Sequence, residues 1–126
     1  GYTMLMVATS MAVNPSLRAK LPYDTLNDFA AVTLLIFSPN VLVTHPSVPA
    51  KTVKELIALA RAQPGQLAYA SGGTGSATHL AGELLAMQSG GRMTHVPYKG
   101  AAPATIDLLS GQVSWMFGTI LPTIPH

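Results

Sequence analysis

One glycine-rich segment holds the residues whose types and spacing could do chemistry. It runs directly into a predicted helix and consists of Ser71, Gly72, Gly73, Thr74, Gly75 and Ser76. Because glycine has no Cβ, the backbone N–H groups of such a loop can approach a ligand closely. The hydroxyl groups of Thr74 and Ser76 add donors, and a helix start adds unpaired N–H groups and about half a positive charge. The segment therefore suits a carboxylate or a phosphate, although an ordinary tight turn in which Ser76 only caps the helix has the same pattern.

The loop does not match the common nucleotide-binding motifs. A Walker-type loop needs a lysine directly before its serine, and Gly75 stands there instead. A dinucleotide fingerprint needs a third glycine, where this chain has Thr78, and an acidic residue after the next strand, where none occurs before Asp107. We therefore disfavour a nucleotide as the ligand.

Two histidines near the loop suggest other chemistry. His79 and Glu83 are four residues apart, so they share a helix face, but two ligands are too few for a metal site. We interpret them as a structural pair and expect no metal and no cofactor. His95 lies on a predicted strand that ends near Lys99, where a cation could attract an acidic solute. We favour a histidine packed between sheet and helix and a solvated lysine.

A small α/β hydrolytic enzyme is the alternative from another functional class. Ser76 and His79 are three residues apart at a helix start and could act as nucleophile and base. However, Glu83 is the one evident acid that could orient the histidine, and Ser76 lacks the G-x-S-x-G turn of a strained nucleophile. We therefore expect no catalysis.

The elements that must position the loop alternate between strands and helices. Strands are predicted at 67–71, 93–98 and 113–117, with helices at 76–88 and 103–110 between them. Strands separated by helices can pair only in parallel, which predicts an α/β fold. Ligands bind such sheets beyond the carboxyl ends of the strands, and the glycine-rich loop follows a strand.

The first half of the chain has weaker signals. Thr52 and Glu55 have the spacing of a capping box and predict a helix that ends at Pro64-Gly65. Apolar, β-prone runs predict three strands, at Thr3–Ala8, Ala31–Ile36 and Val41–Thr44.

Composition narrows the functional classes. Of the 126 residues, 10% are charged and 48% hydrophobic, whereas an average soluble domain is roughly 25% charged. We therefore expect part of the surface to be covered by a missing part of the same protein or by a partner, and a third hypothesis is a self-associating interaction module. The net charge of +2 includes no basic run, so nucleic acid is not an expected partner.

Further features bear on the compartment and on the completeness of the chain. The chain has no cysteine, which excludes a disulfide scaffold. Proline and glycine interrupt both long uncharged stretches, so we predict no transmembrane helix. The sequence shows no signal peptide, and we expect a fragment of a longer protein.

Five motifs occur in one order along the chain: SPNVLV from Ser38, HPSVPAKTV from His45, YASGGTGS from Tyr69 followed by HLAGE, HVPYKG from His95, and DLLSGQV from Asp107. In this order they resemble the Bug family, the periplasmic solute-binding receptors of tripartite tricarboxylate transporters. The resemblance covers essentially the whole chain.

The resemblance implies a type II periplasmic-binding-protein-like fold, in which two α/β lobes joined by crossing strands enclose a small carboxylate. On that template, residues 1–26 are the end of the first lobe, 27–35 a crossover or hinge strand, and 36–126 most of the second lobe. The intact protein would deliver its ligand to a membrane permease. Because half of the cleft would be missing, we expect this chain alone to bind weakly or not at all, and its open sheet edges favour a dimer or strand exchange.

The resemblance also implies site residues. Ser71 through Ser76 and the following helix start would hold one ligand carboxylate, with His79 beside the pocket and Thr9 and Ser10 contributing from the opposite lobe. The family commonly has Asp at the positions of Ser114 and Gly118. Neither aspartate is present in this chain. Because no acidic residue stands at position 118 to pair with a ligand ammonium group, a plain carboxylate is favoured over an amino acid as the ligand.

Overall fold

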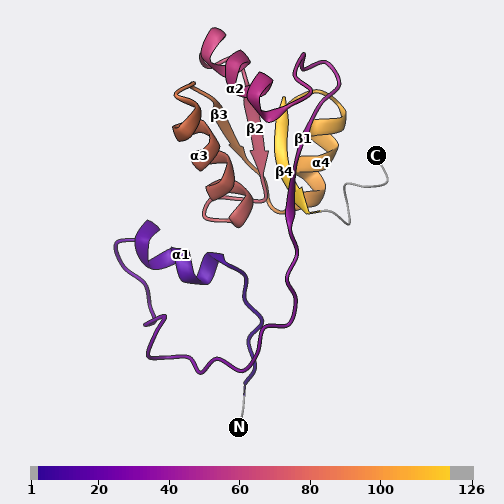
Figure 1. Cartoon of the computed structure of the whole chain (residues 1–126). Coiled ribbons are helices and arrows are strands. Elements are labelled where there is room, and N and C mark those ends of the chain that lie inside the picture. The colour runs from indigo at the N-terminus through magenta and orange to yellow at the C-terminus, as the bar shows by residue number, and fades with distance from the viewer. Residues whose placement is uncertain (1–2, 120–126) are drawn as a thin grey trace.

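The computed structural model describes residues 3–119; expectations that concern Gly1, Tyr2 or residues 120–126 lie outside the described residues. Four helices and four strands follow one another along this part of the chain (Figure 1). Their bounds are α1 Ser10–Leu17, β1 Asn40–Thr44, α2 Val53–Ala62, β2 Ala68–Ser71, α3 Ala77–Ser89, β3 Thr94–Pro97, α4 Ala101–Leu109 and β4 Trp115–Thr119.

The four strands form one mixed sheet in the order β1-β4-β2-β3. Strand β2 pairs in parallel with both β3 and β4, which confirms the α/β class predicted from the alternation of strands and helices. Strand β1 pairs antiparallel with β4 over five residue pairs, from Asn40 opposite Thr119 to Thr44 opposite Trp115. The parallel pairs bring the carboxyl ends of β2 and β3 to one edge of the sheet.

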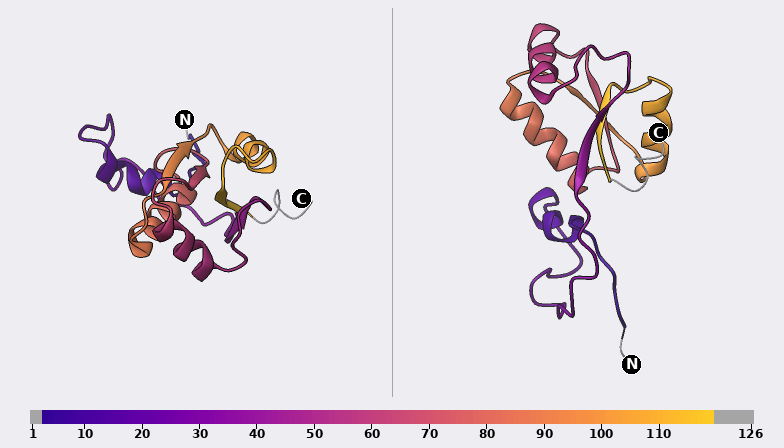
Figure 2. Two further views of the ribbon diagram at one scale, coloured as in Figure 1. Left: turned by 90° about the horizontal axis from the view of Figure 1, so that it is seen from above. Right: turned by 45° about the vertical axis from the view of Figure 1, so that its right-hand side comes forward.

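Helices cover both faces of the sheet. Helices α2 and α3 lie on one face and α4 on the other, as the right-hand view of Figure 2 shows. The first face buries a cluster that includes Leu56, Tyr69 and Trp115, and the second buries one that includes Ala70 and Met116. Tyr69 and Trp115 lie opposite one another on neighbouring strands, and their rings stack with centroids 4.8 Å apart. The glycine-rich loop therefore begins at a tightly packed strand.

Local capping chemistry sets the ends of two helices. The Thr52 hydroxyl accepts a hydrogen bond from the Glu55 amide, and Glu55 accepts one from the Lys51 amide, so the predicted start of α2 is confirmed. Ser76 caps α3 by accepting from the His79 amide. Gly90 ends α3 with a φ of 64°, a left-handed conformation that glycine adopts without a steric penalty.

Two strands predicted in the first half of the chain are not formed, so those predictions are wrong. Neither Thr3–Ala8 nor Ala31–Ile36 has strand structure, and their apolar side chains are exposed; Met4 is 90% exposed and Leu34 80%. Residues 29–39 instead run as an extended segment from the α1 region into β1 (Figure 1). β propensity alone does not make a strand, because a strand also needs a hydrogen-bonded neighbour.

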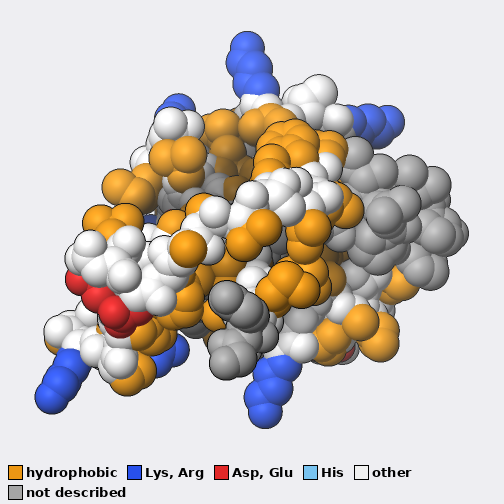
Figure 3. Space-filling model, turned by 90° about the horizontal axis from the view of Figure 1, so that it is seen from below, with side chains coloured by type: hydrophobic (Ala, Val, Ile, Leu, Met, Phe, Trp, Pro, Cys, Tyr) orange, Lys and Arg blue, Asp and Glu red, His pale blue; other side chains and the backbone are white. Residues whose placement is uncertain are grey.

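Apolar side chains gather on the face formed largely by the first part of the chain. Figure 3 shows this face from below, with hydrophobic side chains over much of it and most Lys and Arg side chains near its rim. The exposed hydrophobic side chains in the first part of the chain include those of Met4, Met6, Val32 and Phe37. Soluble proteins rarely leave contiguous apolar patches of this kind uncovered. Within residues 3–119, no helix combines the length and the apolar character that crossing a membrane requires.

Candidate functional site

The glycine-rich loop connects the carboxyl end of β2 to the start of α3. Two of its glycines have backbone conformations that side chains disfavour, Gly73 with a φ of 130° and Gly75 with a φ of 82°. Crowding adds a second constraint at Gly73, where an added Cβ would lie 3.1 Å from the carbonyl oxygen of Tyr98. The loop thus has a defined shape at the edge of the sheet where the carboxyl ends of β2 and β3 lie, which is where open α/β sheets generally bind ligands.

The glycine amides of the loop already donate hydrogen bonds within the protein, so their role as ligand donors stays a prediction. Side chains fold back onto them: Gly72 N donates to Thr78 Oγ1 at 3.0 Å, Gly73 N to Ser71 Oγ at 3.2 Å, and Gly75 N to His79 Nδ1 at 3.2 Å. The Ser76 amide donates to the carbonyl oxygen of Gly73. These glycines serve mainly to shape the loop.

Three other amides at the same place have no protein acceptor among the described residues. They belong to Thr74 in the loop and to Ala77 and Thr78, the first two residues of α3. The amides of the first turn of a helix have no partner within the helix, and here Ser76 satisfies only that of His79. An anion near these N–H groups would gain hydrogen bonds and the favourable end of the helix dipole.

A group of buried and half-buried side chains, linked by hydrogen bonds and ring contacts, supports the loop from beneath. Ser71, the last residue of β2, is fully buried, and its Oγ lies 2.7 Å from His95 Nε2 on β3. The His95 ring packs between the Tyr69 ring, with centroids 5.0 Å apart, and the His79 ring, with centroids 4.1 Å apart. The prediction that His95 packs between sheet and helix is thereby confirmed, and Lys99 is exposed as expected.

Glu83, one turn after His79 in α3, also belongs to the group of side chains beneath the loop. Its Oε1 accepts a hydrogen bond from the Tyr69 hydroxyl and lies 3.7 Å from His79 Nε2. Burial, together with this hydrogen bond to Glu83, raises the pKa of Tyr69, so the phenol remains protonated. Tyr69, His79 and Glu83 therefore tie α3 to the sheet directly below the loop.

The His79, Glu83 and His95 side chains approach closely enough to be considered as metal ligands, since one donor atom from each lies within 4.8 Å of the others. Two features disfavour a metal. His79 Nδ1 accepts from the Gly75 amide, which leaves the proton of the neutral ring on Nε2, the atom that faces Glu83. The planes of the His79 and His95 rings differ by only 31°, so their in-plane lone pairs converge poorly on one ion.

The geometry also disfavours the hydrolytic alternative. Ser76 Oγ accepts from the backbone amide of His79, while the His79 ring is engaged by the Gly75 amide, so the two side chains do not form a nucleophile and base. Ser71 and His95 do have a suitable hydrogen bond, but Ser71 has no exposed surface through which a substrate could reach it.

The N-terminal segment approaches the loop through α1. A Cβ added to Gly75 would lie 2.9 Å from Leu17 Cδ1, so the last residue of α1 packs against the loop. Thr9 and Ser10 stand at the other end of α1, and the described hydrogen bonds do not connect them to the loop. Their assignment to the ligand site therefore stays a prediction.

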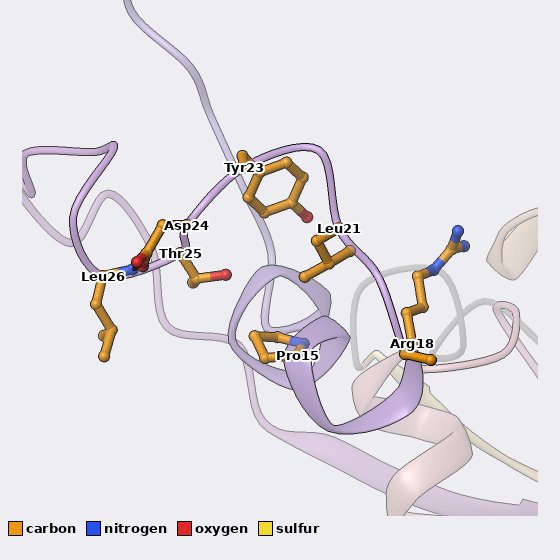
Figure 4. A pocket seen from close by; sticks show the side chains of 8 residues that line it. Pro15, Arg18, Leu21, Tyr23, Asp24, Thr25 and Leu26 are labelled. Carbon is orange, nitrogen blue, oxygen red and sulfur yellow. Dashed lines mark hydrogen bonds between the residues drawn. The ribbon is translucent and has the colours of Figure 1, made fainter.

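Two shallow hollows are lined by residues of this N-terminal segment. One has a volume of about 380 Å³. Figure 4 shows Tyr23, Leu21 and Pro15 around this space beside α1. The second, of about 390 Å³, is lined by Ser10 and by apolar side chains that include Met6 and Phe29. Neither hollow includes a residue of the loop, so neither identifies the predicted carboxylate site.

The sequence pattern does not reveal the side chains that support the loop. From its sequence position, His95 is expected only to pack between the sheet and a helix. The free amides of Ala77 and Thr78 are expected only in the general sense that the start of a helix leaves amides unpaired. A signal was present for His95, because it lies opposite Tyr69 in the β2–β3 register and so shares a sheet face with Tyr69 and Ser71. Recognising it required the order of the strands.

The lowered pKa of His95 makes stability depend on pH. Burial lowers this pKa below 6.5, the neighbouring His79 lowers it further, and Glu83 acts in the opposite direction. As pH falls below about 6.5, the unfolded chain takes up a proton before the folded chain does. We expect the free energy of unfolding to fall from that pH down to the lowered pKa, by at most about 1.4 kcal/mol per pH unit.

Urea unfolding between pH 8 and pH 5 measures this effect, and His95→Gln should flatten the profile. His45→Gln, which changes a histidine outside this network, is the matched control. Equal pH profiles for the wild type and His95→Gln would contradict the assignment.

Comparison with known proteins gives the family. The family model described as the tripartite tricarboxylate transporter family receptor matches residues 1–126. The chain belongs to this receptor family. It is 40% identical over 116 residues to protein BugT of Bordetella pertussis, covering 90% of this chain and 36% of BugT. A UPF0065 protein of Pseudomonas sp. (strain P51) is 36% identical over 120 residues, covering 95% of the chain and 36% of that protein. The chain thus spans little more than a third of the length of these relatives.

Solved structures of receptors agree with the fold. A periplasmic transporter protein superposes with a TM-score of 0.80 at 36% identity, covering 94% of this chain and 38% of the other. A Rhodopseudomonas palustris protein with adipate superposes with a TM-score of 0.78 at 34% identity, covering 85% of this chain and 37% of the other. MatC from Rhodopseudomonas palustris with bound malate superposes with a TM-score of 0.78 at 30% identity, covering 94% of this chain and 39% of the other. The fold is therefore that of the receptors of this family.

Proposed function

We propose that this chain is the ligand-loop portion of a periplasmic receptor that binds a small organic carboxylate for a tripartite tricarboxylate transporter. The observation that supports it most is the set of three unpaired amides, those of Thr74, Ala77 and Thr78, at the start of α3. Related receptor structures contain adipate or malate, both dicarboxylates. An acid group placed at these amides would receive hydrogen bonds without displacing any protein acceptor.

The proposal assigns the chain to two lobes. Residues 36–126 form most of the second lobe, 27–35 the connection, and 1–26 the end of the first lobe. The compact sheet and helices from β1 onward support the first assignment, and the extended segment before β1 supports the second. Leu17 against Gly75 supports an approach of the first lobe to the ligand loop. Thr9, Ser10 and His79 remain candidate ligand contacts.

The intact receptor would act by binding and release, handing its ligand to a membrane permease. Closure of two lobes around a solute is a familiar way to sequester it, and it requires no covalent chemistry. The engaged state of Ser76 and the burial of Ser71 support a receptor rather than an enzyme. The exposed apolar side chains of residues 3–7 and 32–37 suggest that more of the receptor covers them, and self-association of the isolated chain stays a prediction that light scattering can test.

The substitution Ala77→Pro tests the ligand site directly. Proline removes the unpaired N–H of Ala77 and is well tolerated at the first position of a helix. The preceding residue, Ser76, already has a φ of −72° and a ψ of 160°, the conformation that a following proline favours. We expect the affinity for malate or adipate to fall about 10-fold or more, because a hydrogen bond to a charged group is lost, while the fold is retained.

Isothermal titration with malate and with adipate, on the whole receptor that contains this chain, measures the change. Val53→Pro is the matched control, since it makes the same change at the first position of α2, after a residue that is also extended. Unchanged affinity in Ala77→Pro, or an equal loss in Val53→Pro, would contradict the proposed site. Tight binding by the 126-residue chain alone would contradict the two-lobe arrangement.

A further inference from the structure

The hydrogen bonds around Ser71 leave its hydroxyl proton free to point toward His95. Ser71 Oγ accepts from the Gly73 amide, and the same oxygen lies 2.7 Å from His95 Nε2. An amide nitrogen can only donate, so the Ser71 hydroxyl proton is free to point toward His95. His95 Nε2 then acts as the acceptor, which places the proton of the neutral ring on Nδ1. The result is a continuous chain from the Gly73 amide through the Ser71 hydroxyl to His95.

We propose that His95 is a positioning residue for the ligand loop: as a neutral acceptor it orients the buried Ser71 hydroxyl, which holds the Gly73 amide and so fixes the loop that offers its free amides to a carboxylate. The inference rests on the proposed function, because it concerns how the same loop binds. His95 itself acts through Ser71 and does not touch the ligand.

Protonation of His95 removes the acceptor of the Ser71 hydroxyl proton. With a proton on Nε2, Ser71 Oγ would face two donors, and its own proton would need another acceptor. Ser71 is fully buried, so solvent cannot supply one. The Gly75 amide also depends on a histidine. It donates to Nδ1 of His79, whose ring packs against His95. The Gly75 amide donates to a histidine nitrogen that accepts only when it carries no proton, and the Gly73 amide donates to a hydroxyl whose own proton needs the neutral form of His95.

The groups around His95 act on its charge in both directions. Tyr69 on β2 stacks against the ring and remains protonated, so it contributes burial without charge. On α3, a proton on His79 repels one on His95, whereas the carboxylate of Glu83 favours it. Burial has the largest effect, and together with His79 it outweighs Glu83, so the pKa of His95 is lowered. The neutral, loop-holding form is therefore the resting form near neutral pH.

The test follows the loop and the ligand separately, in the ¹⁵N-labelled whole receptor. Between pH 8 and pH 5, the Gly73 amide resonance is expected to shift in step with the His95 ring resonances. In His95→Gln, whose amide oxygen can still accept from Ser71, Gly73 should no longer titrate. Ser71→Ala should uncouple Gly73 while His95 still titrates, and His45→Gln is the control for a change of histidine elsewhere.

Malate affinity, measured by titration calorimetry over the same range, gives the functional result. We expect the wild type to lose about 2- to 10-fold more affinity at low pH than His95→Gln, which corresponds to one hydrogen bond of about 0.5–1.5 kcal/mol. Because malate itself titrates equally with both proteins, their difference isolates His95. A Gly73 resonance that ignores His95, or equal pH profiles of affinity, would overturn the inference while malate binding stands. Absence of malate and adipate binding at every pH would instead overturn the proposed function.

Discussion

Replacement of Trp115 by alanine is expected to lower the free energy of unfolding by about 3–5 kcal/mol, the usual cost of removing a fully buried large aromatic side chain. Trp115 has no exposed surface. Its ring stacks on Tyr69 and meets the edge of Phe117, with centroids 4.8 and 5.8 Å away. Since a domain is stable by only about 5–15 kcal/mol, this loss would bring the chain close to unfolding.

The indole nitrogen allows packing to be separated from hydrogen bonding. Trp115 Nε1 is buried and has no hydrogen-bond partner among the described residues, so substitution forfeits packing and no polar contact. Trp115→Phe should therefore cost clearly less than Trp115→Ala, because a ring is retained against Tyr69. Urea unfolding followed by circular dichroism measures both variants, with Met87→Ala, at a position 78% exposed on α3, as control. A loss below about 1 kcal/mol in Trp115→Ala would contradict the assigned core.

Replacement of Gly82 by alanine is expected to have the second large effect on the free energy of unfolding. The sign of this change shows whether helix propensity or steric overlap with Tyr69 is the larger effect. Helix propensity alone favours alanine over glycine by about 1 kcal/mol in α3. However, a Cβ at this position would collide with the Tyr69 ring, which is buried and held by contacts with His95 and Trp115. Overpacking of this kind costs about 1–3 kcal/mol. We expect a net destabilisation, because the ring cannot move away.

Leu84 provides the matched control in the same helix. Its side chain is 55% exposed, so Leu84→Ala and Leu84→Gly together measure helix propensity without the clash. Alanine should be more stable than glycine at position 84 and less stable at position 82, as judged by urea unfolding. Greater stability of Gly82→Ala would mean that α3 does not lie directly on the Tyr69 ring.

Gly82 also connects packing to the site. The close approach that it permits brings Glu83 to the Tyr69 hydroxyl and His79 to the His95 ring. A displaced α3 would therefore carry the amides of Ala77 and Thr78 with it. We expect Gly82→Ala to weaken the Tyr69–Glu83 contact even where the protein remains folded.

The sequence predicts a helix, strand or loop correctly where the hydrogen bonds that define it join residues close together in the chain. The start of α2 followed from Thr52 and Glu55, three residues apart, whose hydrogen bond is observed. The alternation of strands and helices after Leu67 was correctly anticipated for the same reason, since caps and apolar periodicity are local properties. The glycine-rich loop was likewise located from its own residues.

Long-range partners decided the rest. The run Ala31–Ile36 has strand-forming residues but no strand neighbour in the described sheet, and the antiparallel pairing of β1 with β4 joins residues about 75 positions apart, as the register shows. The glycine amides turned out to be occupied because the side chains of Ser71, Thr78 and His79 fold back onto them.

By itself, the sequence determined that a glycine-rich loop links a buried strand to a capped helix, because these features depend on residues a few positions apart. The tertiary structure alone decided which amides of that loop remain free and that His95, 24 positions from Ser71, supports it. The physical reason is that hydrogen bonds between separate elements exist only once the sheet order and the packing of α3 bring their donors and acceptors together.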